Sequence, residues 1–158
     1  MNKVILVGKA AAGKDHMRKI LSGRGFQYGI SYTTRPPREG EIDGKDYFFL
    51  TDEEATKMVE SNMFYEHVYF NGWLYGTSVE QFYNNDLFIM TPAGISYIKP
   101  EDRTSSFIIY TDIDMSVREV RLSKRDMPGD SLTRRIEADE LDFKDFSDYD
   151  LKVTNPDF

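Results

Sequence analysis

A glycine-rich segment near the N-terminus has the residue types and spacing of a phosphate-binding loop. Gly8-Lys9-Ala10-Ala11-Ala12-Gly13-Lys14-Asp15 follows an apolar run and precedes a stretch with a helical pattern. In such a loop, backbone N–H groups and the start of the helix surround phosphate oxygens, while the lysine reaches the terminal phosphates. The alternative is an ordinary glycine-rich turn. The full G-x4-G-K spacing directly after the first apolar run favours binding of a nucleoside triphosphate.

Asp15 departs from the usual form of this motif, in which Ser or Thr follows the lysine and binds Mg²⁺ through its hydroxyl. A carboxylate is also a hard oxygen ligand for Mg²⁺, so the role can be retained. It adds negative charge beside the phosphates, which is tolerable mainly when a metal ion lies between them. The alternative is that Asp15 only complements the positive end of the helix dipole. We treat Asp15 as a candidate magnesium ligand.

A second cationic segment lies at residues 31–47. Arg35 and Arg38 flank Pro36-Pro37, and Tyr47 follows. Arginine recognises phosphate with a two-pronged set of donors, and proline lowers the entropic cost of ordering them. A solvated surface loop is the alternative. The pattern favours a semi-rigid pocket for a second phosphate group.

These segments together resemble guanylate kinase, a nucleoside monophosphate kinase with a phosphate-binding loop. The resemblance is densest in Ser31-Tyr32-Thr33-Thr34-Arg35-Pro36-Pro37-Arg38-Glu39-Gly40-Glu41-Ile42-Asp43-Gly44-Lys45-Asp46-Tyr47. It continues in Phe64-Tyr65-Glu66 and Tyr75-Gly76-Thr77-Ser78, and it reaches Asn155. A long ungapped block of this kind is more specific than the glycine-rich loop alone.

The resemblance implies roles for individual residues. Glu66 matches the carboxylate that accepts hydrogen bonds from guanine N1–H and the 2-amino group, and Thr77 matches the hydroxyl that meets guanine O6. A site with such polar partners discriminates strongly, because the wrong base leaves them buried and unpaired. The residues that match the phosphate-binding positions for GMP are Ser31, Arg35, Arg38, Tyr47 and Tyr75. Glu41 also fits the block, and we assign it to the structure of the loop.

The resemblance also implies a set of arginines around the transferred phosphoryl group. Arg121, Arg125 and Arg135 match the arginines of the family's lid and of the helix after it, although arginines on an exposed helix are common. Cations placed there stabilise charge on the phosphoryl oxygens in the transition state. With Lys14 and Arg38 they make the expected catalytic set. Asn155 matches an asparagine near the ATP adenine.

The sequence departs from the family in three further places. Ile89 and Thr91 stand where the family usually carries carboxylates, so Asp15 is expected to supply a carboxylate that this strand lacks. The segment between Arg125 and Arg135 is about one residue shorter than the family pattern. The sequence ends at Phe158, where the family continues through a helix, which implies weaker donor binding or a compensating partner chain.

Composition excludes several other classes of function. The chain has 158 residues, 20 basic and 27 acidic side chains, a net charge of −7 and no cysteine. Thiolate metal sites, disulfides and cysteine nucleophiles are therefore excluded. The negative charge argues against nucleic acid or an anionic membrane as partner. With no membrane-length apolar run or secretory leader, the expected location is cytoplasmic.

The hydrophobic pattern predicts an α/β fold, because apolar runs alternate with helix-like stretches. Strands are expected at residues 4–7, 87–90, 107–110 and 151–154. Helices are expected at residues 14–21, 52–61, 79–84, 117–125 and 132–143. Two helices begin with apparent capping boxes, Thr51 with Glu54 and Ser78 with Gln81. The acidic stretch at residues 137–150 is interpreted as a solvated face.

Residues 32–76 break this alternation and predict an inserted sheet that is mostly antiparallel. Residues 47–50 and 64–70 read as strands, and Asn71-Gly72 predicts a hairpin turn into Trp73-Leu74-Tyr75. We expect a single domain with a three-layer P-loop fold and a parallel sheet at its centre. Its core comprises residues 1–31 and 77–158, with a short helical lid at about 121–136.

The sequence thus predicts an ATP-dependent kinase of GMP and dGMP that requires Mg²⁺ and has nucleotides as its partners. Two alternatives stay open. One is a kinase that accepts several (deoxy)nucleoside monophosphates, for which the altered residues Ile89 and Thr91 leave room. The other is a guanylate-kinase-like binding domain without catalysis, although Lys14 and the arginines are all present.

Overall fold

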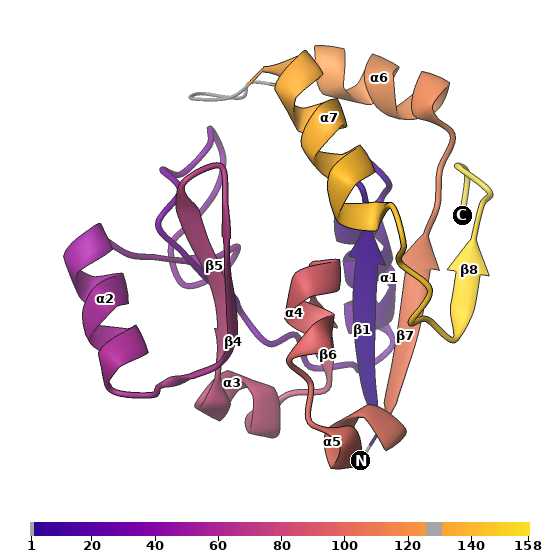
Figure 1. Ribbon diagram of the computed structural model, residues 1–158. Coiled ribbons are helices and arrows are strands. Elements are labelled where there is room, and N and C mark those ends of the chain that lie inside the picture. Colours follow the sequence, from indigo (N-terminus) through magenta and orange to yellow (C-terminus); the bar gives the residue numbers. More distant parts are fainter. Residues whose placement is uncertain (1, 126–130) are drawn as a thin grey trace.

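A four-stranded parallel sheet forms the centre of the molecule (Figure 1). The computed structural model describes residues 2–125 and 131–158. In order across the sheet, the strands are β6 (Leu87–Ile89), β1 (Lys3–Gly8), β7 (Ser106–Thr111) and β8 (Leu151–Val153), and every neighbouring pair is parallel. All six residues of β1 are buried, as expected for a central strand covered on both faces.

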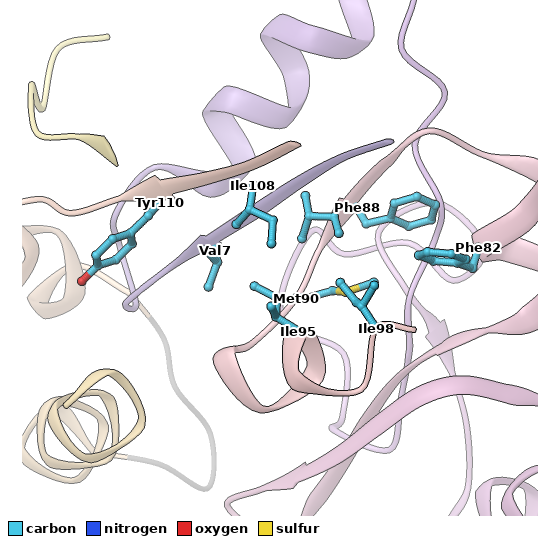
Figure 2. Close-up of a cluster of buried hydrophobic side chains, with 9 residues drawn as sticks. Val7, Phe82, Phe88, Met90, Ile95, Ile98, Ile108 and Tyr110 are labelled. Atoms are coloured by element: carbon cyan, nitrogen blue, oxygen red, sulfur yellow. The ribbon is translucent and has the colours of Figure 1, made fainter. Parts of the chain in front are cut away.

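Alternate residues of β1 pack into two separate apolar clusters. Ile5 and Val7 face a cluster built on the α4 side of the sheet, whose members Phe88, Met90 and Ile95 are drawn in Figure 2. Val4 and Leu6 face the opposite cluster, which is closed by Met17 and Leu21 of α1. This alternation with a period of two produces the three-layer arrangement.

Seven helices are described in residues 2–125 and 131–158. They are α1 (Lys14–Gly23), α2 (Asp52–Glu60), α3 (Val79–Asn84), α4 (Pro92–Ser96), α5 (Pro100–Thr104), α6 (Met115–Ser123) and α7 (Leu132–Phe143). In Figure 1, α6 and α7 lie beyond the carboxyl ends of β1 and β7, where the phosphate loop also lies. Ligands of open α/β sheets bind at this edge.

A second sheet lies beside the core and is inserted between α1 and α3. Its strand order is β3 (Phe48–Phe49), β2 (Tyr32–Thr33), β5 (Trp73–Ser78) and β4 (Phe64–Phe70). The β2–β3 pair is parallel and the other two pairs are antiparallel, so the predicted character of the insertion is confirmed. Asn71 and Gly72 both have positive φ (55° and 77°), as a two-residue hairpin turn requires.

Most predicted elements lie where the sequence pattern places them, but α6 is shifted by two residues and three short elements, β2, α4 and α5, were not predicted. The predicted bounds of α3, α7 and β4 agree with the structure. The helix predicted from residue 117 begins two residues earlier, because Asp114 accepts a hydrogen bond from the Ser116 backbone N–H. The short helices α4 and α5 were not predicted, since five residues are too few to display a period.

Only one of the two hydrogen bonds of the second predicted capping box is present. The Ser78 hydroxyl does accept from the Gln81 N–H, but the Gln81 side chain does not return to Ser78. Its oxygen instead accepts from the backbone of Ile30 and from the side chain of Asn85. The first box is complete, with Thr51 and Glu54 each accepting from the backbone of the other.

None of the helices in the described part of the chain combines the length and the apolar character needed to cross a membrane.

The complete capping box at α2 predicts a measurable loss of stability when it is opened. Thr51→Ala removes the acceptor for the Glu54 N–H, and we expect a loss of about 1 kcal/mol in the free energy of unfolding by urea. Thr56→Ala is the matched control, because this exposed hydroxyl only donates to the Asp52 carbonyl within the helix. Equal effects of the two substitutions would show that the cap contributes nothing specific.

Candidate active site

The phosphate loop joins the end of β1 to the start of α1 through two left-handed residues. Ala11 has φ 61° and Gly13 has φ 85°, and Gly13 is the N-cap of α1. Gly8 lies so close to β7 that a Cβ there would stand 2.2 Å from Thr111 Oγ1. Lys14 Nζ donates to the Gly8 carbonyl and so bridges the two ends of the loop. The loop therefore has the closed cradle shape that the spacing predicts.

Lys14 is half-buried among other cations. Burial, together with Arg135 and Arg125, lowers the pKa of Lys14 to about 8, while Asp139 and Asp15 act in the opposite direction. An anion placed beside this ammonium group would offset the unfavourable burial. The positive charge of Lys14 is therefore only partly balanced by the neighbouring acids.

The loop with the double proline is held rigid by Glu41. Its carboxylate accepts from both Arg35 Nη atoms at 2.9 and 3.0 Å and from the Arg38 N–H at 2.7 Å. Burial raises the pKa of Glu41, but these hydrogen bonds outweigh it and leave the pKa lowered. Glu41 therefore belongs to the structure of the loop, as the sequence analysis assigned it.

Arg38 is left with unused hydrogen-bonding capacity. Its Nε is buried and has no hydrogen-bond partner among the described residues. Burial lowers the pKa of Arg38, and the guanidiniums of Arg35 and Arg125 lower it further. Since buried donors are nearly always satisfied, this atom points to an anionic ligand.

One cavity lies between the phosphate loop and the inserted sheet. Seven of the predicted site residues line it, namely Gly8, Lys14, Ser31, Tyr47, Glu66, Tyr75 and Arg135. The further lining residues are Tyr28, Val68, Phe70, Gly76, Ile89, Met90, Thr91, Pro92, Asp139, Asp142 and Phe143. Residues about 120 positions apart in the chain, such as Lys14 and Arg135, therefore line the same cavity.

Glu66 is a carboxylate buried at the far end of this cavity. It is 7% exposed on β4, and its Oε1 accepts from the Thr77 hydroxyl at 2.8 Å. Burial raises the pKa of Glu66 to about 7, and the hydrogen bonds from Thr77 offset only part of that effect. A Cβ on Gly94 would lie 2.6 Å from Glu66 Oε2, so glycine at that position leaves this oxygen accessible. The carboxylate is thus placed to accept hydrogen bonds from a ligand.

A second pocket lies on the other side of the phosphate loop. It is lined by Ala11, Gly13, Asp15, His16, Arg121, Arg125, Pro156 and Phe158. Arg121 donates to the carbonyls of Ala11 and Pro156 at 2.9 and 3.0 Å, so it faces this pocket rather than the first cavity. The Asn155 side chain accepts from the Asp157 N–H. The predicted shortening between Arg125 and Arg135 falls on residues 126–130, which lie outside the described residues.

The described residues offer few oxygen ligands for a magnesium ion. They contain no group of three His, Asp, Glu or Cys side chains arranged to hold a metal. Ile89 is apolar, and the Thr91 hydroxyl is used as the N-cap of α4. Asp15 remains, with its carboxylate 3.2 Å from Arg18 Nε and largely exposed. One carboxylate is sufficient for an ion that takes its other ligands from phosphate oxygens and water.

Comparison with known proteins identifies the family. The family model described as guanylate kinase matches residues 1–88, which is more than half of the chain. The chain belongs to the guanylate kinase family. It is 32% identical to the guanylate kinase of Sus scrofa, and the match covers 96% of this chain and 83% of that protein. It is also 32% identical to the guanylate kinase of Homo sapiens, with coverage of 96% of this chain and 84% of that protein.

The fold of this guanylate kinase agrees with a solved structure. The crystal structure of guanylate kinase from Anaplasma phagocytophilum superimposes with a TM-score of 0.75 at 20% identity, covering 98% of this chain and 76% of that one. At this identity the likeness concerns the fold alone. It supports the arrangement of a parallel core sheet with an inserted second sheet.

Asp139 is a buried acid that the sequence pattern does not reveal. Asp139 was included in a stretch interpreted as a solvated face, and that interpretation is wrong for this residue, which is 4% exposed. Its Oδ2 accepts from the Ala10 N–H at 2.9 Å. The available signal was spacing, because Asp139 follows Arg135 by four residues and therefore shares its face of the helix.

The raised pKa of Glu66 predicts a pH-dependent stability. The ordinary value is 4.5 and the folded value is about 7, so the folded protein binds more protons than the unfolded chain between these values. The free energy of unfolding therefore falls as the pH rises through this range, by up to about 3 kcal/mol. Glu66→Gln removes this titration.

Urea unfolding between about pH 5 and about pH 8 measures the effect. We expect the stability of Glu66→Gln relative to the parent protein to increase with pH. Glu80→Gln, an exposed acid on α3, serves as the control and should leave the pH dependence as it is. Parallel curves for the parent protein and Glu66→Gln would contradict the assignment.

Proposed function

We propose that this guanylate kinase transfers the terminal phosphoryl group of ATP to GMP or dGMP within the cavity described above. The observation that carries the proposal is that Lys14 of the phosphate loop and the buried carboxylate of Glu66 line the same cavity. A donor bound by the loop and an acceptor whose base meets Glu66 would point their phosphates toward each other. Such positioning supplies a large part of catalysis in phosphoryl transfer.

Guanine fits the far end of the cavity by its hydrogen bonds. Its N1–H and 2-amino group are adjacent donors, and the carboxylate of Glu66 has two oxygens to accept them. Thr77 gives its one hydroxyl hydrogen to Glu66 in the structure, and it would give that hydrogen to O6 of the base. Two donors on the base favour the ionised carboxylate, so GMP would lower the pKa of Glu66.

The acceptor phosphate would lie at the cationic loop. Ser31, Tyr47 and Tyr75 line the cavity there, and Arg38 contributes the Nε that has no partner among the described residues. Arg35 is held by Glu41, which fixes the direction of its guanidinium. A phosphate would satisfy the free donor and reduce the repulsion between the arginines.

The donor triphosphate would lie in the phosphate loop, with Lys14 and the loop amides of Ala11 and Gly13 as ligands, since the Ala10 N–H already donates to Asp139 and the Ala12 N–H to the Lys9 carbonyl. Arg125 and Arg135 would stabilise charge on the transferred group, while Arg121 shapes the donor side through the carbonyls of Ala11 and Pro156. Asn155 would lie near the adenine. No group of the protein forms a covalent intermediate in this scheme.

Mg²⁺ would be held by oxygens of the donor phosphates and water, with Asp15 as the carboxylate from the protein. When bound, it neutralises charge on the phosphates. Asp15 would have to leave Arg18 to reach such an ion, since the two are paired in the structure.

A panel of acceptors tests the proposed function. With ATP as donor, we expect release of ADP with GMP and dGMP and little with AMP, CMP or dTMP. Glu66→Gln should reduce the preference for GMP over AMP by about 100-fold or more, because the amide cannot accept both hydrogens. Similar rates across the panel would favour a broad monophosphate kinase, and silence with every acceptor would favour a binding domain.

Replacement of Asp15 tests the magnesium ligand. Asp15→Ala should raise the Mg²⁺ concentration needed for half-maximal turnover by about tenfold, and Asp15→Ser should restore most of it through its hydroxyl. Calorimetry with the Mg²⁺ complex of a non-hydrolysable ATP analogue should likewise show weaker binding to Asp15→Ala than to Asp15→Ser. Unchanged Mg²⁺ dependence in both variants would exclude Asp15 as a ligand.

A further inference from the structure

Helix α7 is joined to the phosphate loop by a buried hydrogen bond. The Asp139 carboxylate is 4% exposed and accepts from the Ala10 N–H at 2.9 Å. Burial of a carboxylate is costly unless charge and hydrogen bonds compensate it. Asp139 also lines the cavity together with Lys14 and Arg135.

We propose that Asp139 is a positioning residue that anchors α7 to the phosphate loop and so holds Arg135 over the same cavity as Lys14. The proposal rests on the proposed function, in which Arg135 acts on the transferred phosphoryl group. Arg135 and Asp139 are four residues apart on α7, and both face the cavity. A hydrogen bond that fixes Asp139 therefore also fixes the rotation of the helix about its axis.

The other end of α7 contacts the acceptor side. The Arg135 guanidinium lies 4.4 Å from the centre of the Phe70 ring on β4, which belongs to the inserted sheet. Ile136 and Leu132 of the same helix pack against an apolar cluster that includes Ala10 and Ala11 of the loop. Helix α7 thus contacts both the donor loop and the acceptor sheet. Among its described contacts with the loop, the Asp139 hydrogen bond is the buried polar one.

The neighbouring acid provides a matched comparison. Glu140 Oε1 lies 2.9 Å from Lys9 Nζ, but its side chain is 50% exposed. Exposed ion pairs contribute little, whereas a buried acceptor for a backbone N–H leaves that group unsatisfied when it is removed. The two acids stand on the same turn and differ in burial and in the type of bond that they make.

The alternative is that the Asp139 carboxylate competes with the donor phosphates for the loop. Its charge faces Lys14, and phosphate oxygens would approach the same ammonium group. If competition were its role, removal of the charge would strengthen ATP binding and leave turnover intact. If anchoring is its role, the hydrogen bond matters and the charge does not.

Steady-state kinetics on five variants separate these cases. Asp139→Ala should lower kcat by about tenfold or more and change the KM for GMP by less than about threefold, because it loosens Arg135 and leaves the acceptor site intact. Asp139→Asn retains an oxygen acceptor and should stay within about threefold of the parent kcat. Glu140→Gln is the control and should do the same. In an Arg135→Ala background, Asp139→Ala should lower kcat by less than about threefold, because Asp139 acts through that arginine.

Amide hydrogen exchange of Ala10 without nucleotide gives a readout that does not depend on catalysis. Exchange should accelerate by about tenfold or more in Asp139→Ala and stay near the parent rate in Asp139→Asn and Glu140→Gln. Should Asp139→Ala fail to fold, Asp139→Leu tests the same loss in a side chain that keeps the branching at Cγ. If the parent protein phosphorylates no nucleotide, the proposed function fails, and the exchange rates still decide whether Asp139 anchors the loop.

Three kinetic or binding results would overturn the proposal. They are an unchanged kcat in Asp139→Ala, an equal loss in Asp139→Asn and Asp139→Ala, and tighter ATP binding with unchanged turnover in both variants. Failure of both Asp139→Ala and Asp139→Leu to fold would likewise overturn it, because the residue would then serve stability alone.

Discussion

Unbalanced positive charge around the phosphate loop is the constraint on which the site depends. Lys14 and Arg135 line the first cavity, and Arg125 lines the pocket on the other side of the loop. Burial lowers the pKa of Lys14, Arg38 and Arg125. The protein as a whole carries a net charge of −7, so this concentration of cations is local. The cations stand on different elements: Lys14 on α1, Arg38 in the loop before β3, Arg125 after α6 and Arg135 on α7. Bound phosphate groups would supply the missing negative charge.

The two ends of the cavity differ in how they would select a ligand. At the guanine end, a buried carboxylate and a hydroxyl present specific acceptors and donors to the edge of a base. At the donor end, the loop offers backbone amides and cations that recognise phosphates without regard to the base. From the chemistry of the lining residues we therefore expect selectivity for the base of the acceptor and tolerance toward the base of the donor.

Much of this arrangement follows from local sequence pattern. The apolar runs before Gly8 and around Ile108 predict the parallel strands, and the positive-φ pair at residues 71 and 72 follows from Asn-Gly. The burial of Asp139 cannot be predicted in this way, because it lies in an acidic stretch and nothing in the neighbouring sequence indicates its hydrogen bond with Ala10. The same holds for Gln81, whose bond to Ile30 spans 51 residues. Long-range polar contacts depend on the tertiary fold, which no local period encodes.

A crystal structure with a bisubstrate ligand, adenosine and guanosine joined through five phosphates, tests the central claim most directly. The account predicts the guanine edge within hydrogen-bonding distance of Glu66 and Thr77, the phosphate chain beside Lys14 and Arg38, and the adenosine beyond the phosphate loop. A ligand that binds with guanine away from Glu66, or with its phosphates outside the cavity shared by Lys14 and Arg135, would contradict it.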